Sequence, residues 1–211
     1  MIDIREQLNA VERRIGDRSI EAGAAKTVTI SETYRASIDD VWDACTNPER
    51  LPRWFLPVSG ELRPGGSYQF EGNAGGTIET CDPPHSVTAT WEYGGAVSWV
   101  ELRLHPESDE RTRLELTHIM LPDEHWVEFG PGATGIGWEL ALIGLARHLD
   151  SGAGVDPAAA ATWPTSQEGL EFVTISSQRW LDAHLAAGAD EAAARASAER
   201  CTAFYTGAAP A

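Results

Sequence analysis

The feature that most constrains this chain is a run of short β-strand patterns between residues 59 and 120. Apolar residues alternate with polar ones in six segments, and turns such as "RPGG" and "YGG" separate them. Strands this close together leave no room for crossover helices, so the pattern predicts an antiparallel meander with one apolar face and one solvated face. The expected strands cover residues 59–63, 67–72, 76–81, 86–93, 97–105 and 111–120.

A long helix is expected after the strands. Trp138, Leu142 and Leu145 recur at helical spacing and predict a helix over about 134–150, whose apolar stripe can cover one face of a curved sheet. Ser37 caps a shorter predicted helix over 38–46. The fold class that follows is α+β. The other expected elements are a helix over 2–15, a linker over 16–25, a strand over 26–36, a linker over 151–164, and helices from Thr165 to about 187 and over about 190–205.

Charge and cysteine usage exclude several classes of protein. Sixteen Lys and Arg against thirty-two Asp and Glu give a formal charge of −16, which repels nucleic acids and anionic membranes. No segment is apolar enough to span a bilayer, and the start lacks the apolar core of a signal peptide. Three separated cysteines without a CxxC pair favour reduced thiols. We therefore expect a cytoplasmic protein with no metal, no cofactor, and neither nucleic acid nor membrane as partner.

Two motifs allow more than one interpretation. The segment "GPGATG" (130–135) matches a dinucleotide fingerprint, but no βαβ unit surrounds it, so we interpret it as the entry to the long helix. His118 alternates with Leu116 and Met120 and should point to the apolar side of its strand. It is either a buried, hydrogen-bonded histidine or a polar group in a ligand cavity. No GxSxG elbow or P-loop is present.

Several phrases in one continuous order carry a family resemblance. They are "ASIDDVWDACTNPERLPRWF" (36–55), "LRPGGSYQF" (62–70), "GTIETCDPPHSVTATWEY" (76–93), "TRLELTHIML" (112–121) and "GIGWELALIGLARHL" (135–149). Together they resemble the SRPBCC (START-like) superfamily, and within it the branch named after the activator of the 90-kDa heat-shock-protein ATPase. The resemblance implies a helix-grip domain over 26–150, in which an antiparallel sheet wraps around the long helix and leaves an apolar cavity. Residues 1–25, a helix and linker, and 151–211, a linker and helical extension, lie outside it.

Three functions are open at this point, because the superfamily includes binders, enzymes and co-chaperones. We favour non-catalytic binding of an apolar small molecule. The first alternative is a cyclase-like enzyme that uses His118 as acid or base, assisted by Glu79, Glu101 or Tyr93. The second is a co-chaperone or interaction module, and we also consider a homodimer formed through the terminal helices. The residues expected to line or gate the cavity are Trp54, Phe55, Phe70, Trp91, Trp99, His118, Trp138 and Leu142.

The turn "LPRWFLP" (51–57) holds the first two of these residues. Two prolines enclose a Trp-Phe pair where nothing in the local pattern buries them. In a helix-grip layout this turn follows the first short helix and leads to the sheet. We expect at least one of Trp54 and Phe55 to be a core anchor, and the alternative is a gate on the cavity.

Overall fold

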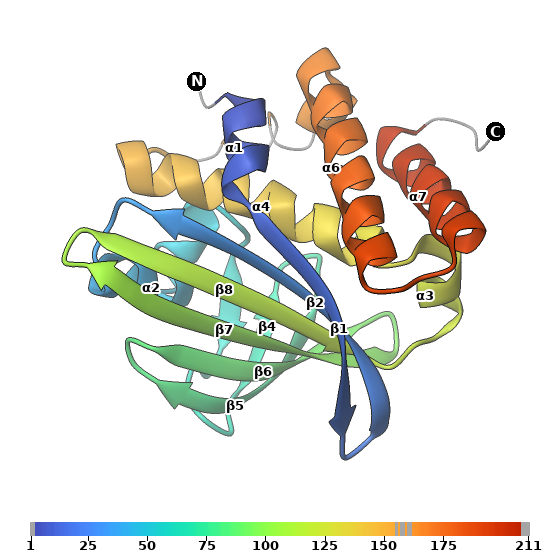
Figure 1. The fold of residues 1–211 in the computed structure, drawn as a ribbon. Helices are drawn as coiled ribbons and strands as arrows, with labels where there is room; N and C mark the ends of the chain where they lie inside the picture. Colours follow the sequence, from blue (N-terminus) through green and yellow to red (C-terminus); the bar gives the residue numbers. More distant parts are fainter. Residues whose placement is uncertain (1–2, 155, 157–158, 160–161, 208–211) are drawn as a thin grey trace. The chain divides into compact units, whose positions relative to one another are not determined.

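The computed structural model describes residues 3–154, 156, 159 and 162–207. Eight strands form one antiparallel sheet in the order β1-β2-β8-β7-β6-β5-β4-β3 (Figure 1). Together with a long helix and further helices, this is an α+β fold of the helix-grip type, as predicted. The strands are β1 (Glu12–Ile20), β2 (Gly23–Tyr34), β3 (Val58–Gly60), β4 (Ser67–Phe70), β5 (Gly75–Asp82), β6 (Ser86–Tyr93), β7 (Ala96–Ser108) and β8 (Arg111–Met120).

The chain divides into two compact units. Unit 1 contains residues 1–30, 121–140 and 156–211, and unit 2 contains residues 31–120 and 141–155. Helix α4 (Gly132–Ser151) therefore begins in unit 1 and ends in unit 2. The expected division at residues 26 and 150 rests on the resemblance alone and stays a prediction.

The meander predicted from residues 59–120 is confirmed as strands β3 to β8 of unit 2. Leu102 and Leu104 of β7 pair with Leu116 and Leu114 of β8, and all four side chains lie on the same face because residues two apart on a strand point the same way. Three of these leucines are buried and the fourth, Leu102, is half-buried. The alternating pattern therefore set both the strand positions and the apolar face.

Two short helices precede the meander in unit 2. Helix α2 (Ile38–Thr46) begins after Ser37, whose hydroxyl accepts from the Asp40 amide at 3.3 Å, as the sequence predicts. The single turn η1 (Leu51–Arg53) follows, with Pro52 in its first positions where a missing N–H costs nothing. This turn carries the aromatic pair of "LPRWFLP" into unit 2.

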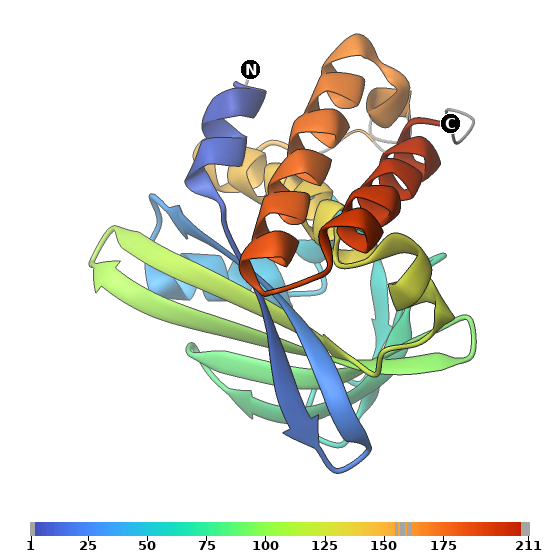
Figure 2. The ribbon, with the colours of Figure 1, turned by 45° about the vertical axis from the view of Figure 1, so that its right-hand side comes forward.

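Unit 1 is mainly helical. It contains α1 (Ile4–Ala10), α3 (Glu124–Phe129), η2 (Trp163–Thr165), α6 (Gln167–Ala186) and α7 (Glu191–Thr206). Helices α6 and α7 lie side by side in both views (Figures 1 and 2). The two expected C-terminal helices are confirmed, although Ser166 rather than Thr165 caps α6, accepting from the Gly169 amide at 3.1 Å. Parts of the expected linker over 151–164 lie outside the described residues.

The N-terminal prediction is wrong beyond residue 10. Instead of a helix to residue 15 and a linker to 25, the chain forms α1, then β1, and β2 from Gly23. Arg13 explains the change: its side chain is only 6% exposed and its Nε donates to Glu139 Oε1 at 2.5 Å. Together with the pairing of β1 to β2, this ion pair is a tertiary contact that overrides a local pattern which is not strand-like.

The segment "GPGATG" is a junction between helices. Gly130 ends the short helix α3, which was not expected, with a positive φ of 59° that favours glycine, and α4 begins at Gly132. The strand pairs determined from β3 to β8 are all antiparallel. A dinucleotide fingerprint needs a parallel βαβ unit, so that interpretation has no support here. Among the described residues, no helix is both long and apolar enough to cross a membrane.

Candidate functional site

Five ring-bearing side chains of unit 2 form a continuous series of contacts, which we call the aromatic row. In order along the row they are Trp54, Phe55, Phe70, Trp91 and His118. Centroids of consecutive rings lie 5.6, 5.0, 5.8 and 6.1 Å apart, and the ring pairs are tilted or edge-to-face. These separations and angles are favourable for aromatic packing.

The sheet register places two members of the row, Trp91 and His118, on one face. Trp91 of β6 pairs with Ser98 of β7, and Val100 of β7 pairs with His118 of β8. Ser98 and Val100 are two residues apart and share a face, so Trp91 and His118 lie on that face as well. Phe70 comes from β4 and reaches Trp91 with its ring. The period-two pattern of the sequence therefore positions these side chains.

The burial of the row is uneven. Its four Trp and Phe side chains are all half-buried, whereas His118 at its end is buried. Tyr68, two residues before Phe70, is also buried, and its hydroxyl donates to the Thr90 carbonyl at 2.6 Å. Sequence reasoning missed Tyr68, although its alternation with Phe70 carried the signal. The row is thus a partly accessible aromatic surface supported by buried neighbours.

His118 is held as a neutral hydrogen-bond donor. Its Nε2 lies 2.8 Å from the Ser98 hydroxyl, and that hydroxyl donates to the Trp91 carbonyl at 3.0 Å. Ser98 has one proton to give, so it accepts from His118, whose Nε2 then carries the hydrogen. Burial lowers the pKa of His118 to about 4, because a charged imidazolium would lose its hydration. At neutral pH this end of the row carries no charge.

The turn at the other end is anchored by backbone contacts. Trp54 donates its Nε1 hydrogen to the Ala44 carbonyl of α2 at 2.8 Å. Its own carbonyl lies against Gly144 of α4, where an added Cβ would be only 2.3 Å from that oxygen. Arg53 donates to the Gly152 carbonyl at 2.8 Å. These contacts fix the direction in which Trp54 and Phe55 leave the turn.

Three predicted lining residues lie outside the row. Trp99 pairs with Thr90 and Ile119, so it lies on the opposite face of the sheet from His118. Leu142 is buried in the part of α4 that belongs to unit 2. Trp138 belongs to unit 1. The structure therefore brings five of the eight predicted residues together, and the cavity-lining role of all eight stays a prediction.

The residues expected to assist His118 in catalysis lie elsewhere. Glu101 pairs with Thr117 and Thr88, which places it on the same face as Trp99 and opposite to His118. Glu79 and Tyr93 are exposed. Among the described residues, no group of three or more His, Cys, Asp or Glu side chains could hold a metal ion.

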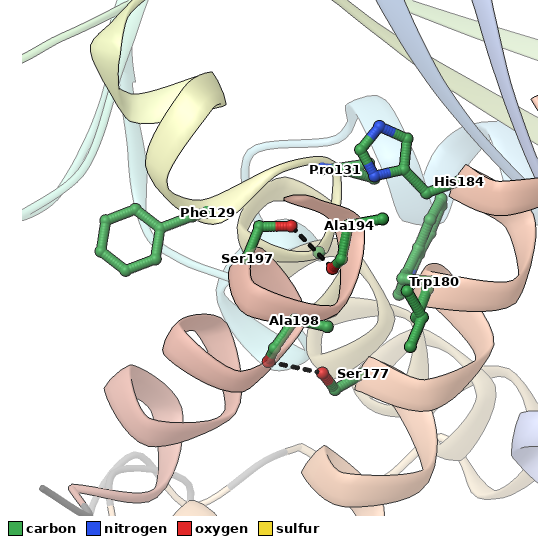
Figure 3. Close-up of a pocket in the computed structure, with 10 residues that line it drawn as sticks. Phe129, Pro131, Ser177, Trp180, His184, Ala194, Ser197 and Ala198 are labelled. Carbon is green, nitrogen blue, oxygen red and sulfur yellow. Dashed lines mark hydrogen bonds between the residues drawn. The ribbon is translucent and has the colours of Figure 1, made fainter. Parts of the chain in front are cut away.

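A small pocket in unit 1 is a poor candidate for a ligand site. Trp180 and His184 of α6 and Ser197 of α7 line it (Figure 3). Ser177 and Ala198 also line it, and the Ser177 hydroxyl donates to the Ala198 carbonyl at 3.1 Å, which joins the two helices. Its volume of about 10 Å³ is room for one water molecule at most. Its role is in helix packing.

A wider surface groove runs between the same two helices. Its volume is about 390 Å³, and its lining combines polar side chains such as Gln178, Arg195 and Glu199 with the apolar Leu181, Ala198 and Ala203, but contains no aromatic side chain. Sites for small apolar ligands are concave and lined mainly by apolar and aromatic side chains. The aromatic row has the aromatic side chains that this groove lacks.

Comparison with known proteins identifies a matching family and similar solved structures. Residues 35–150 match the model of a family described as "Activator of Hsp90 ATPase homolog 1-like protein". A solution structure of CalU16 from Micromonospora echinospora is 36% identical, covers 85% of this chain and 97% of its own, and has a TM-score of 0.73. Its crystal structure is 37% identical, covers 82% and 98%, and has a TM-score of 0.67.

More distant structures show the fold alone. DynU16, from the dynemicin biosynthetic locus, is 22% identical with a TM-score of 0.51, and covers 61% of this chain and 48% of its own. An Aha1 dimer from Colwellia psychrerythraea is 18% identical with a TM-score of 0.52, and covers 61% and 98%. Among proteins with curated descriptions, none matches this chain.

Proposed function

The chain belongs to the activator of Hsp90 ATPase homolog 1-like family, and on that premise we propose that it binds an apolar small molecule against the aromatic row. The observation that supports the proposal is the contact of four half-buried Trp and Phe rings in one series. In a core such rings are buried, and on most monomers large apolar groups are scattered singly. A contiguous, partly accessible aromatic surface is typical of a binding site.

The chemistry of the row favours an uncharged ligand. None of its members carries a charge at neutral pH, since burial keeps His118 in its neutral form. A charged ligand group placed here would lose its hydration without an ionic partner in the row, which is costly. A flat apolar molecule would instead gain contact with the ring faces and edges.

Binding is better supported than catalysis. A general base works best when its pKa lies near the working pH, and a pKa of about 4 makes His118 a weak base at neutral pH. Its Nε2 hydrogen is directed at Ser98, and Glu101 lies on the other face of the sheet. The role that suits this histidine is to end the row with a fixed polar group.

The test is a titration with N-phenyl-1-naphthylamine, an uncharged fluorescent probe. Trp91→Leu should weaken probe binding ~10-fold, because an aromatic contact of about 1.5 kcal/mol is lost. Trp99→Leu is the matched control: it removes the same side chain from the neighbouring strand on the opposite face, and it should leave the affinity unchanged. Native mass spectrometry of the freshly purified protein would show whether an apolar ligand is already bound.

Two results would overturn the proposal. One is wild-type affinity for the probe in Trp91→Leu together with a loss in Trp99→Leu. The other is failure of the wild-type protein to bind the probe, combined with a native mass that corresponds to the bare chain. Far-ultraviolet circular dichroism of both variants ensures that a loss of affinity is not a loss of folding.

Self-association is a second proposal, which rests on a different surface. Val127 of α3 and Phe204 of α7 are 74% and 68% exposed, and the Phe204 ring lies 5.7 Å from that of Phe129. Large exposed apolar side chains of this kind favour a protein contact. If a homodimer forms there, Phe204→Ser should lower the mass measured by light scattering to that of a monomer. A monomeric wild-type protein would contradict it.

A further inference from the structure

Two rings of the aromatic row meet across a strand that lies between them. Phe70 is on β4 and Trp91 is on β6, and β5 separates these two strands in the sheet. Neighbouring strands are about 4.8 Å apart, so β4 and β6 are about 10 Å apart, yet the two ring centroids are separated by only 5.8 Å. The Phe70 amide donates to the Ala74 carbonyl at 3.0 Å, and Gly76 pairs with Tyr68. The row therefore crosses β5 where this strand carries only small residues.

The ladder between β5 and β6 is irregular at the same place. Pairing holds at Gly75 and again from Ile78, but it skips Gly76 and Thr77 in this stretch of the described sheet. The register on both sides would put Thr77 opposite Thr90. In a regular antiparallel ladder an amide that points to the neighbouring strand donates to a backbone carbonyl there. The Thr77 amide donates instead to the side-chain Oγ1 of Thr90, at 2.8 Å.

The Thr90 hydroxyl is oriented to accept this bond. It donates its one proton to Glu92 Oε1 at 2.9 Å, which leaves an oxygen lone pair for the Thr77 amide. The backbone carbonyl of Thr90 then accepts from the Tyr68 hydroxyl, at 2.6 Å. A side chain of β6 thus takes one bond of the ladder, and a side chain of β4 binds the carbonyl.

Tyr68 connects the two rings that meet across β5. Its own ring contacts Phe70 edge-to-face with centroids 5.5 Å apart, and its hydroxyl holds the carbonyl of Thr90, the residue before Trp91. Burial raises the pKa of Tyr68, so the hydroxyl keeps the proton that it donates. Gly76 leaves room for this contact, because an added Cβ would be 2.3 Å from the Thr90 carbonyl oxygen. Irregularities of this kind redirect side chains next to functional sites.

We propose that Tyr68 and Thr90 are positioning residues of the aromatic row. Thr90 diverts the Thr77 amide to its side chain, and Tyr68 uses the Thr90 carbonyl to fix the contact between Phe70 and Trp91. A flat ligand that lies against both rings at once needs that contact to be in place before it binds. This role rests on the proposed binding function, because it concerns the same surface.

The arrangement can be tested without a ligand. Thr90→Val keeps the shape of the side chain but has no hydroxyl, so the Thr77 amide should donate to the carbonyl of residue 90 and compete with Tyr68 for it. A long-range HNCO spectrum should then show a coupling across this new hydrogen bond that wild type lacks. The nuclear Overhauser effect between the rings of Phe70 and Trp91 should weaken. Thr90→Ser retains the hydroxyl and should restore the wild-type result in both measurements.

Two further variants separate positioning from general effects on the sheet. Tyr68→Phe removes one oxygen atom and keeps the ring, so it should weaken the same nuclear Overhauser effect without creating the new coupling. Thr88→Val is the matched control, because it makes the same substitution two positions earlier on the same face of β6. The Thr88 hydroxyl bonds to that of Thr80 at 2.8 Å and contacts no member of the row, so this variant should keep the wild-type spectra.

The affinity for N-phenyl-1-naphthylamine follows the effect on the site. Tyr68→Phe and Thr90→Val should each bind the probe ~10-fold more weakly, as expected for loss of one hydrogen bond that orients the row. Thr90→Ser and Thr88→Val should bind it as wild type does. Far-ultraviolet circular dichroism shows whether each variant is folded, and Tyr68→Phe, the smallest change, decides the question if Thr90→Val does not fold.

The outcomes separate this proposal from the binding function. A wild-type nuclear Overhauser effect between Phe70 and Trp91 in Tyr68→Phe would overturn the positioning role, and so would a Thr90→Ser variant that behaves like Thr90→Val. Failure of the wild-type protein to bind the probe would overturn the binding function instead. The spectra of the ligand-free variants would still decide whether Tyr68 and Thr90 position the two rings.

Discussion

Gly144 of α4 lies directly against the backbone carbonyl of Trp54, so closely that an added Cβ would be 2.3 Å from the oxygen. Both groups belong to rigid backbone, one in a helix and the other at the end of η1. Only glycine, which has no Cβ, allows α4 to lie this close to the Trp54 carbonyl. It therefore sets the distance between α4 and the start of the aromatic row.

Gly144→Ala should destabilise the protein and disturb the row. Alanine favours a helix, but the forced separation should outweigh this and cost about 1–3 kcal/mol of unfolding free energy, as overpacking in cores does. The variant should also bind the apolar probe more weakly, because Trp54 moves. Urea denaturation measures the first effect and probe titration the second. Gly154→Ala is the control, since its Cβ would meet nothing closer than 3.8 Å. Equal stability of Gly144→Ala and wild type would contradict the expected clash.

The strands from β3 to β8 could be predicted because their signals are local. Alternation around Leu102 and Leu104, with turn residues at each end, fixes a strand and its faces without reference to the rest of the chain. Strand β1 could not be predicted this way. Its Arg13 is stabilised by Glu139, which is 126 positions away in the sequence. A contact of that range leaves no trace in a local pattern.

In the candidate site, too, the features with a local signal could be predicted and those that depend on long-range contacts could not. The alternation with Leu116 placed His118 on the apolar face, and the same rule applied to Val100 would have put Trp99 on the opposite face. That signal was present in the sequence. The Arg50–His148 hydrogen bond was not predictable, because it depends on the end of α4 meeting the residues that follow α2. Charged residues in such places look like a solvated surface in the sequence.

The Arg13–Glu139 ion pair of unit 1 should respond asymmetrically to mutation. Both side chains are nearly inaccessible, with 6% and 1% exposed, so removal of one partner leaves a buried charge. Glu139→Leu alone should cost about 3–5 kcal/mol, whereas the double variant Arg13→Met with Glu139→Leu should recover most of that loss. Urea denaturation of the single and double variants measures both. The surface pair Arg195–Glu191 is the control, and Glu191→Ala there should cost less than about 1 kcal/mol. Additive losses in the double variant would contradict the expectation.

The three cysteines should differ in reactivity. The thiolate is the reactive form, and burial raises the pKa of both Cys45 and Cys201 to about 12, which keeps them protonated. Cys81 on β5 is half-buried, and its pKa is raised by partial burial and by Asp82. With 5,5′-dithiobis(2-nitrobenzoic acid), Cys81 should react first and the other two only on unfolding in urea. Cys81→Ser should remove the first phase and Cys45→Ser should keep it. A fast phase that survives Cys81→Ser would show that Cys45 or Cys201 reacts in the native protein and would contradict this order.

His118 should make the protein less stable in mild acid. In an unfolded chain histidine titrates near pH 6.5, whereas burial lowers the pKa of His118 to about 4 in the folded protein. The unfolded state therefore binds the proton first, and the stability from keeping His118 neutral is complete above pH 6.5 and is lost as the pH falls towards 4. From about pH 7.5 to pH 5, wild type should lose about 2 kcal/mol more unfolding free energy than His118→Gln does.

Urea denaturation at both pH values gives this difference directly. Comparing the change in unfolding free energy between the two pH values cancels any effect of the substitution that does not depend on pH. His105→Gln is the control for replacing a histidine by glutamine at an exposed position, and it should lose as much unfolding free energy as wild type does. If His118→Gln loses as much stability in acid as wild type, His118 takes up its proton equally in the folded and unfolded states, and burial does not hold it neutral in acid. The explanation that burial fixes an uncharged end of the aromatic row would then have to be abandoned.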